Sequence, residues 1–220
     1  ALGTERGLCG LAFAGDAGAP LHVSVAAEQS AAPWSVRKAD SILREKPAVL
    51  TEKWDYDTGL ILKGFEQIGL ETKDRKYLDY VKRTIDGIVQ PDGTIRGYRL
   101  EEYNIDMINM GKVIFHLLAQ STDPKDKERY TKALQHLRSQ MRTHPRTKER
   151  AFWHKKIYPN QMWLDGVFMA SPFLAEYAVV FQEPALFDDV ANQILLAEKY
   201  MRDPKTGLLY TPVIHACATY

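Results

Sequence analysis

Cysteine is scarce in this sequence, which has only Cys9 and Cys217 among its 220 residues. Two thiols at opposite ends of a chain cannot by themselves build a disulfide framework or a cysteine-ligated metal cluster. Long apolar runs are also missing, because none approaches the roughly 20 residues that a membrane-spanning helix needs. The sequence therefore predicts no membrane partner, and its cysteines say little about the compartment.

An excess of charge is absent as well, because 29 lysine and arginine residues nearly balance 28 aspartate and glutamate residues, giving a net charge of +1. We therefore expect no nucleic-acid partner. The sequence has neither a glycine-rich phosphate loop nor a metal-ligand spacing, so no cofactor and no metal are expected. The chain does have 45% hydrophobic residues, which is enough for a sizeable core.

The first 33 residues differ in amino-acid composition from the rest of the chain. They are rich in alanine and glycine and contain the run LCGLAFA with the small-x-small pattern Ala12-Phe13-Ala14. This resembles a degenerate secretory signal, in which Asp16 interrupts the apolar stretch. We expect residues 1–33 to be poorly structured or signal-like and residues 34–220 to form the folded domain. A periplasmic or secreted location and a cytoplasmic one both remain open.

Beyond Pro33 the hydrophobic residues follow helical spacing, and two kinds of helix alternate. Segments with one apolar stripe and one polar face, as outer helices have, lie at 75–89, 125–142 and 185–201. Segments that are apolar around most of their circumference, as buried inner helices are, lie at 57–70, 105–120 and 165–181. A short helix at 35–45 precedes them. In the last outer segment, the stripe consists of Phe187, Val190, Ile194 and Met201.

This alternation predicts an all-α fold made of helical hairpins. Because consecutive elements usually pack as neighbours, a two-layer ring with inner helices around a central pocket fits better than a four-helix bundle. About seven helices, however, give only a little more than half of a ring of six hairpins. The edge helices should therefore present apolar residues such as Val190, Ile194 and Leu195 to solvent or to another subunit, which makes self-association possible.

Each inner helix is entered through acidic, aromatic or amide side chains. The entries read WDYDTG (54–59), YNID (103–106) and NQMWLDG (160–166), and all three should open at the same end of the ring. A cavity lined by carboxylates and aromatic rings suits carbohydrate, because sugar rings stack on aromatic faces while carboxylates handle hydroxyl groups and protons.

A simpler explanation exists for each of these residues taken alone. Aspartate and asparagine are favoured at helix starts for capping and dipole reasons, which would account for Asp57, Asn104, Asp106 and Asp165. A lone histidine such as His154 often bonds a backbone carbonyl, and tryptophans such as Trp153 and Trp163 are often core residues. The convergence of three such entries at one end is what favours a binding site.

Four runs carry a resemblance to a known family: FWHKKIYPNQMWLDGVFMASPFLAEYA, KWDYDTGLILKGF, YNIDMINMGKVIF and FDDVANQ. Over roughly residues 33–210 the chain resembles glycoside hydrolase family 105, the unsaturated rhamnogalacturonyl hydrolases. The resemblance implies an (α/α)6 barrel, incomplete in this chain, that acts in pectin degradation on short rhamnogalacturonan fragments with an unsaturated galacturonyl end. It also implies hydration of the C4=C5 vinyl ether of that sugar, without metal or organic cofactor.

The resemblance further implies a role for each residue of the site. Asp165 matches the general acid and base, and Asp106 matches the second carboxylate that holds and tunes the substrate. His154 and Trp163 match residues that contact the sugar, and Tyr56 is a weaker match from the first entry. Trp153, from the same aromatic segment as Trp163, is added as a substrate-binding residue.

The protonation of Asp165 poses a physical problem, because a helix N-terminus favours the anion whereas protonating a carbon atom requires the acid. We expect desolvation beside Trp153 and Trp163, together with the charge of Asp106, to oppose this effect. The two carboxylates would then share one proton.

The chain departs from the family pattern at two places. Asn109-Met110-Gly111-Lys112 replaces the sequence Asn-Pro-Gly-Lys, which should alter a turn or a helix start. Thr211 occupies the position of a family histidine, and His215 stands in no matching context. Two alternatives to the family's activity therefore stay open: an inactive truncated fragment that at most binds oligosaccharide, and a conventional glycosidase with two carboxylates.

Overall fold

The computed structural model describes residues 32–210 and 214–215 of the chain. Contacts between Cα atoms separate residues 1–33 from residues 34–220, and the fold of the second unit follows. Its α-helices are α1 (Trp34–Glu45), α2 (Tyr56–Thr72), α3 (Arg75–Asp86), α4 (Lys112–Gln120), α5 (Pro124–Thr143), α6 (Leu164–Val180) and α7 (Ala185–Met201). Two 3₁₀ helices, η1 (Leu100–Glu102) and η2 (Ile105–Gly111), and two short strands, β1 (Gln161–Met162) and β2 (Ile214–His215), complete the described elements.

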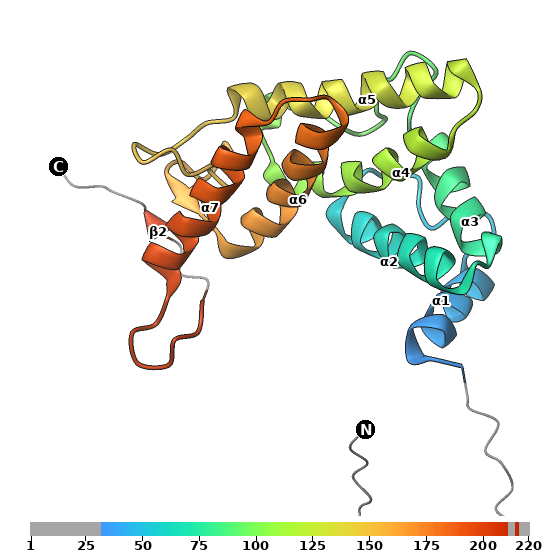
Figure 1. Ribbon diagram of the computed structural model, residues 1–220, viewed down its shortest axis with the longest axis horizontal. Helices are drawn as coiled ribbons and strands as arrows, with labels where there is room; N and C mark the ends of the chain where they lie inside the picture. Colours follow the sequence, from blue (N-terminus) through green and yellow to red (C-terminus); the bar gives the residue numbers. More distant parts are fainter. Residues whose placement is uncertain (1–31, 211–213, 216–220) are drawn as a thin grey trace, which may run out of the picture. The chain divides into compact units, whose positions relative to one another are not determined.

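The helices form a series of hairpins in which α2 packs on α3, α4 on α5 and α6 on α7 (Figure 1). The first members of the hairpins also contact one another, because η2 and α4 lie between α2 and α6. The predicted all-α fold of seven helices is therefore confirmed for the described residues. None of the described helices is long and apolar enough to cross a membrane.

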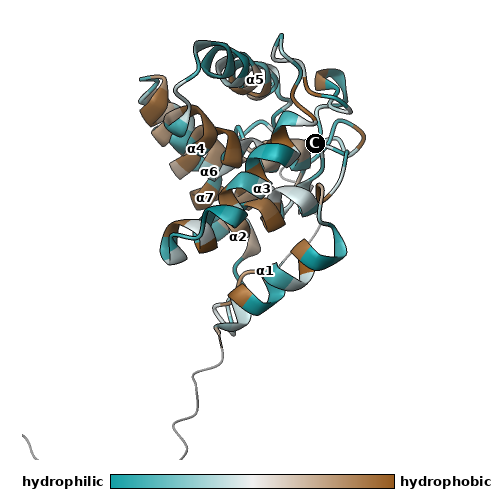
Figure 2. Ribbon diagram, turned by 90° about the vertical axis from the view of Figure 1, so that its right-hand side faces the viewer, coloured by the Kyte–Doolittle hydropathy of each residue, from teal (hydrophilic) through white to brown (hydrophobic). Residues whose placement is uncertain are grey.

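Hydrophobic pattern separates the inner helices from the outer ones. Figure 2 shows α5 mainly in hydrophilic colours, whereas α4 and α6 are mainly hydrophobic. Outer helix α5 buries a single stripe that includes Tyr130, Leu134 and Leu137, which are all fully enclosed. The helix periodicity thus turns one face of each outer helix inward and leaves the other in water.

Aspartates fix the starts of three helices. The side chains of Asp55, Asp74 and Asp123 accept hydrogen bonds from backbone amides in the first turns of α2, α3 and α5, at 2.8, 3.0 and 2.8 Å. Pro124 follows Asp123 as the first residue of α5, where its missing amide hydrogen costs nothing.

Glycines allow the inner helices to approach each other closely. A Cβ atom on Gly59 of α2 would lie 2.7 Å from the Cα atom of Met110 in η2. A Cβ atom on Gly111 would meet the side chains of Leu137 and Phe173, at 2.6 and 2.9 Å. These contacts fix the position of η2, and therefore of Asp106, between α2 and α6.

Helix boundaries agree with the sequence except at two places. The segment predicted as one helix at 105–120 is a 3₁₀ helix up to Gly111, and only from Lys112 does it become α-helical. The helix predicted at 75–89 ends at Asp86, and Ile88, although buried, lies beyond it. The change of helix type falls within Asn109-Met110-Gly111-Lys112, where the sequence predicted an altered helix start.

Two predictions about burial need correction. The predicted stripe of α7 is only partly buried: Met201 is enclosed, whereas Phe187 is 46% exposed and α7 turns Leu186 and Leu196, outside the stripe, inward. The inner helices are not enclosed on nearly all sides either. Leu60 of α2 and Phe168 of α6 are 42% and 49% exposed, since no described helix covers that side of the inner helices.

Several predictions concern residues outside the described part of the chain. These are the signal-like character of residues 1–33, apart from its last two residues, and the replacement of a histidine by Thr211. The backbone of His215 pairs with Gln161 in the antiparallel contact of β2 with β1, and its side chain lies outside the description.

Candidate active site

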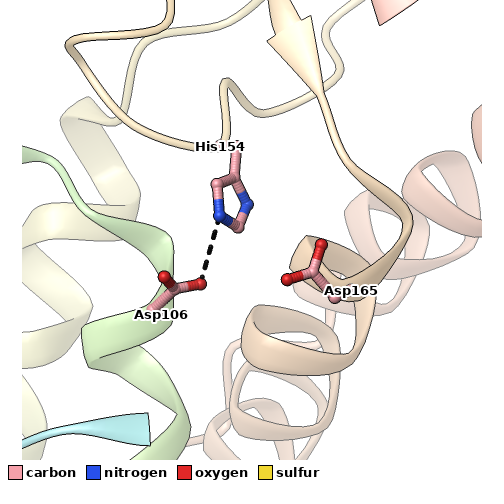
Figure 3. A group of neighbouring side chains, drawn as sticks. All are labelled: Asp106, His154 and Asp165. Carbon is pink, nitrogen blue, oxygen red and sulfur yellow. Dashed lines mark ion pairs between the residues drawn. The ribbon is translucent and has the colours of Figure 1, made fainter. Parts of the chain in front are cut away.

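Three segments that are far apart in sequence bring Asp106, His154 and Asp165 together (Figure 3). One side-chain oxygen or nitrogen atom of each residue lies within 4.8 Å of the corresponding atoms of the other two. Asp106 comes from η2, Asp165 from the first turn of α6, and His154 from the loop between α5 and β1. The structure thus places these three predicted residues at one site, at the starts of two inner elements.

Backbone hydrogen bonds attach the histidine loop to η2. The amide of Ile105 donates to the carbonyl of His154 at 3.0 Å, and the amide of His154 donates to the carbonyl of Gln161 at 2.7 Å. An isolated antiparallel bridge joins Asn104 to Lys155. These bonds hold His154 over Asp106 through the main chain, independently of any side-chain contact.

Asp106 is a buried carboxylate whose partners are cationic or can become so. It is 6% exposed, and its two oxygens lie 3.3 Å from His154 Nε2 and 2.8 Å from Lys155 Nζ. Burial by itself would raise the pKa of Asp106, but the contacts with His154 and Lys155 outweigh it and hold the pKa below its usual value. Asp106 is therefore the ionised carboxylate of the site.

Aromatic rings stack in a row beside the carboxylates. The rings of His154 and Trp163 are nearly parallel, with centroids 4.2 Å apart and an interplanar angle of 6°. Tyr158 stacks on Trp163, with ring centroids 5.2 Å apart and an interplanar angle of 16°. The stack fixes the plane of the imidazole and explains why Trp163 is neither a core residue nor free.

Asp165 is exposed, in contrast to Asp106. The desolvation expected from Trp153 and Trp163 is not found, because Trp163 turns its ring into the stack with His154. Trp153 is not among the residues lining the cavity beside His154, although its neighbours Phe152 and His154 are. Such alternation is the geometry of an extended segment, whose successive side chains point to opposite sides.

The simple capping explanation fails for each of the three aspartates. Asn104, not Asp106, caps η2, since its side chain accepts a hydrogen bond from the amide of Asp106 at 3.1 Å. Asp55, not Asp57, caps α2. Trp163 occupies the cap position of α6 without a side-chain bond, and Asp165 lies in the first turn. Asp106 and Asp165 are therefore not explained as helix caps.

Tyr56 lies at the start of α2, at the edge of the site. It is 39% exposed, and its backbone carbonyl accepts a hydrogen bond from Asn109 at 3.0 Å. The pKa of its hydroxyl is raised, chiefly by the charge of Asp57 and also by that of Asp106, while Lys155 acts in the opposite sense. The phenol therefore lies within the electrostatic influence of the site.

Two residues of the site were not singled out from the sequence. Lys155 is the closest cationic partner of Asp106, and Tyr158 extends the aromatic stack. Both stand in the run WHKKIYPNQMW, but nothing in that run distinguishes Lys155 from its neighbour Lys156, which is exposed. Only the bridge between Asn104 and Lys155 reveals which lysine faces the carboxylate.

The cluster also has the composition of a metal-ligand set. An imidazole and two carboxylates within 4.8 Å could hold a cation, although the sequence, in which these ligands are far apart, predicted no metal. Lys155 already neutralises one oxygen of Asp106 at 2.8 Å, which opposes a second positive charge there. The geometry therefore fits proton chemistry better than cation binding.

Comparison with known proteins identifies the chain. Residues 28–216 match the model of Glycosyl Hydrolase Family 88. The chain belongs to this family. A curated relative of this family 88 protein is the unsaturated rhamnogalacturonyl hydrolase YesR of Bacillus subtilis (strain 168), which is 23% identical over 162 residues. That alignment covers 71% of this chain and 44% of YesR.

Solved structures support the same grouping. A glycoside hydrolase of family 105 from C. acetobutylicum ATCC 824 is 48% identical, with a TM-score of 0.75, over 81% of this chain and 48% of that one. A possible family 105 member from Klebsiella pneumoniae, 20% identical with a TM-score of 0.62 over 72% of this chain and 40% of that one, shares the fold. The predicted resemblance is confirmed, and the chain spans somewhat less than half the length of these relatives.

Proposed function

We propose that this family 88 protein hydrolyses unsaturated galacturonyl-rhamnose oligosaccharides by hydrating the C4=C5 vinyl ether. The observation that carries the proposal is a pair of carboxylates in unlike surroundings, with oxygens within 4.8 Å of each other: Asp106 is buried and held ionised, whereas Asp165 is exposed. Environments that differ in this way separate a fixed negative charge from a carboxyl group that a substrate can reach.

In the proposed reaction Asp165 acts first as an acid and then as a base. Its proton is transferred to C4 of the vinyl ether, which leaves a positive charge shared by C5 and the ring oxygen. Asp165, now ionised, takes a proton from a water molecule whose oxygen bonds to C5. The resulting hemiketal opens to a ketone, and the sugar's former ring oxygen is freed, so that the anomeric carbon can release the rhamnose-bearing partner.

The fixed charge of Asp106 supports the first half-reaction, because it stabilises the positive charge that develops at C5. Lys155 and His154 contact Asp106 at 2.8 and 3.3 Å and stabilise its anion. The proton shared between Asp106 and Asp165, which the sequence suggested, stays a prediction.

The remaining predicted residues have roles in binding. The stacked rings of His154, Trp163 and Tyr158 form a rigid wall beside the carboxylates. Tyr56, which is 39% exposed, lies at the start of α2. We assign these side chains to sugar binding, with Trp153 behind the wall rather than at its surface.

The carboxylate separation also bears on the alternative of a conventional glycosidase. Inverting enzymes hold their carboxyl groups about 6.5–9.5 Å apart to admit a water molecule, and retaining ones about 5 Å. A separation within 4.8 Å disfavours inversion and leaves a retaining enzyme as the second candidate. An inactive oligosaccharide-binding fragment is the third.

One experiment separates these three functions. The chain is joined to the region of the C. acetobutylicum relative that it does not cover, and loss of ultraviolet absorbance is followed with lyase-digested rhamnogalacturonan. We expect Asp165→Asn to lower the rate at least 1,000-fold, on the order of a lost acid-base group, while oligosaccharide binding persists. Asp188→Asn, in the first turn of α7, is the matched control.

The possible outcomes decide among the candidates. Cleavage of saturated glycosides with the unsaturated ones left intact would identify a retaining glycosidase. Binding without any turnover, also after Thr211→His restores the family histidine, would identify a binding protein. Full activity of Asp165→Asn would remove Asp165 from the mechanism.

A further inference from the structure

A small cavity lies beside the imidazole of His154. It is lined mainly by apolar side chains, with His154, Ser171 and Gln193 as its polar members. The volume available to the centre of a water molecule is about 10 Å³. That is close to the space of a single water molecule.

Two buried polar atoms on the cavity wall have no hydrogen-bond partner within the described residues. They are Nδ1 of His154 and Oγ of Ser171, and their residues are 2% and 6% exposed. Leaving such an atom unpaired is unfavourable, so buried polar groups almost always have a partner. Two unpaired atoms that share one cavity of this size indicate one shared partner.

Gln193, the third polar residue of the wall, is already occupied. Its amide nitrogen donates to the carbonyl of Arg150 and to Asp189, at 3.0 and 3.1 Å, and its oxygen accepts from the amide of Phe152 at 3.0 Å. These bonds hold the Gln193 side chain in place. His154 Nδ1 and Ser171 Oγ are therefore the two atoms of the cavity that still need a partner.

Gly166 keeps the space beside the imidazole open. A Cβ atom at this position would lie only 3.2 Å from His154 Nδ1. Gly166 and Ser171 both belong to α6, the helix that also carries Asp165. The cavity thus connects the histidine to the helix of the exposed carboxylate.

We propose that one buried water molecule occupies this cavity, bridges Ser171 Oγ to His154 Nδ1, and makes Ser171 a positioning residue for the site. The water donates to Nδ1 and accepts from the serine hydroxyl. With Nδ1 occupied as an acceptor, the neutral imidazole carries its proton on Nε2, which lies 3.3 Å from Asp106. The serine thereby selects the tautomer that turns an N–H group toward the ionised carboxylate.

The consequence for catalysis rests on the proposed function, whereas the water and the tautomer do not. In the reaction proposed above, a histidine locked in this form keeps its Nε2–H group directed at the ionised Asp106. Because the bridge belongs to the folded chain alone, it is tested without substrate.

The test uses the chain itself, labelled with ¹⁵N at histidine, and a high-resolution crystal structure. We expect a spectrum in which Nε2 of His154 is protonated and Nδ1 is an unprotonated, hydrogen-bonded nitrogen, and an ordered water in contact with both atoms. Ser171→Ala should shift the Nδ1 resonance toward that of a free imidazole nitrogen. Gly166→Ala should give the same shift by displacing the water, and Ser139→Ala, at an exposed position of α5, should give none.

Several results would overturn the proposal. They are a dry cavity in the crystal, a proton on Nδ1 of His154, or an unchanged Nδ1 resonance in Ser171→Ala. If Gly166→Ala fails to fold, Ser171→Ala, which removes a single oxygen atom, decides alone. Loss of the proposed hydration activity would leave these measurements untouched, so that failure of the proposed function and failure of the bridge are distinguishable.

Discussion

The charge of Asp106 is the residue-level feature on which the proposed chemistry depends. A carboxylate that is 6% exposed stays ionised only where cationic partners offset its desolvation, and Lys155 is the nearest, at 2.8 Å. Lys156, the next residue, is exposed and directs its amine to the carbonyl of Glu101 at 3.5 Å. The pair of lysines therefore offers a variant and its control.

Lys155→Gln should raise the pKa of Asp106, because burial then acts without the ammonium group. A carboxylate with a lowered pKa in the folded state contributes stability above its unfolded pKa, and this contribution is lost as the pH falls through the folded value. In the variant this contribution should be smaller, and its loss should be complete at a higher pH. Titration of the Asp106 carboxyl by ¹³C NMR checks the direction, with Lys156→Gln as control. An unchanged titration curve would show that His154 alone holds the charge.

Lys112 shows the opposite case, a buried lysine that forms no ion pair within the described residues and is influenced by Glu176 only at longer range. It is 4% exposed, burial lowers its pKa to about 8, and its amine lies 3.9 Å from the ring centroid of Phe168. A lysine with a lowered folded pKa destabilises the fold while it is charged. The penalty shrinks as the pH rises from about 8 toward the ordinary value of 10.5.

Replacing Lys112 by methionine should therefore stabilise the chain at neutral pH. The gain should reach up to about 3 kcal/mol at pH 7 and fall to roughly half of that near pH 9.5. Urea unfolding of both proteins at the two pH values measures the difference. A stabilisation that does not change with pH would mean that the pKa of Lys112 is not lowered in the folded state, and that the gain comes from the packing of methionine.

Residue types near the site could be read from the sequence, but partners could not. Asp106 and Asp165 stood out because each lies at an entry to an inner segment, and His154 stood out in the aromatic run that resembles the family. The burial of Asp106 and the exposure of Asp165 depend instead on how the loop of Lys155 folds over η2. Sequence reasoning assigned desolvation to the wrong carboxylate, because it could not see Trp163 stacked on the histidine.

At the scale of the element, the close contact between α2 and η2 depends on a missing side chain. Gly59 faces the backbone of Met110, where a Cβ atom would lie at 2.7 Å, whereas Gly64 on the same helix has nothing within 4 Å. Backbone cannot move aside as a flexible side chain can. The two glycines therefore separate a packing effect from a helix-propensity effect.

Gly59→Ala should destabilise the chain by about 1–3 kcal/mol, because α2 and η2 must move apart. Gly64→Ala should stabilise it by about 0.5–1 kcal/mol, because alanine favours the helix and meets no neighbour. Thermal unfolding of the two variants measures both effects. Equal effects of the two substitutions would show that α2 and η2 do not pack as described.

The boundaries of most elements followed from periodicity, and the exceptions have physical causes. The helix predicted at 185–201 runs from Ala185 to Met201, as expected. The segment 105–120 could not be resolved into two helix types, because 3₁₀ and α geometry bury similar patterns over one or two turns. The rotation of α7 was also beyond the sequence, since Ile194 and Leu196 are equally apolar and only the packing on α6 chooses between them.

At the scale of the whole folded unit, the free side of α6 and α7 is the feature that most affects behaviour in solution. An apolar groove of about 690 Å³ runs between the two helices and is bordered by Asp165 at one position. Ile194 lines it and is 51% exposed, and Leu195 beside it is 66% exposed. The predicted exposure of these two residues is confirmed, while Val190 is half-buried against the core.

An apolar surface of this kind is a site of association, because transfer of aliphatic side chains out of water is favourable by about 25 cal/mol per Å². We expect sedimentation velocity to show reversible self-association of the chain that increases with protein concentration. Ile194→Glu should weaken the association at least tenfold, which corresponds to about 1.4 kcal/mol, since a carboxylate in the groove would have to be desolvated. Ile157→Glu, at a loop position that is 72% exposed and outside the groove, is the control. If the unmodified chain stays monomeric at all concentrations, or if both variants weaken association equally, the groove between α6 and α7 is not the contact surface.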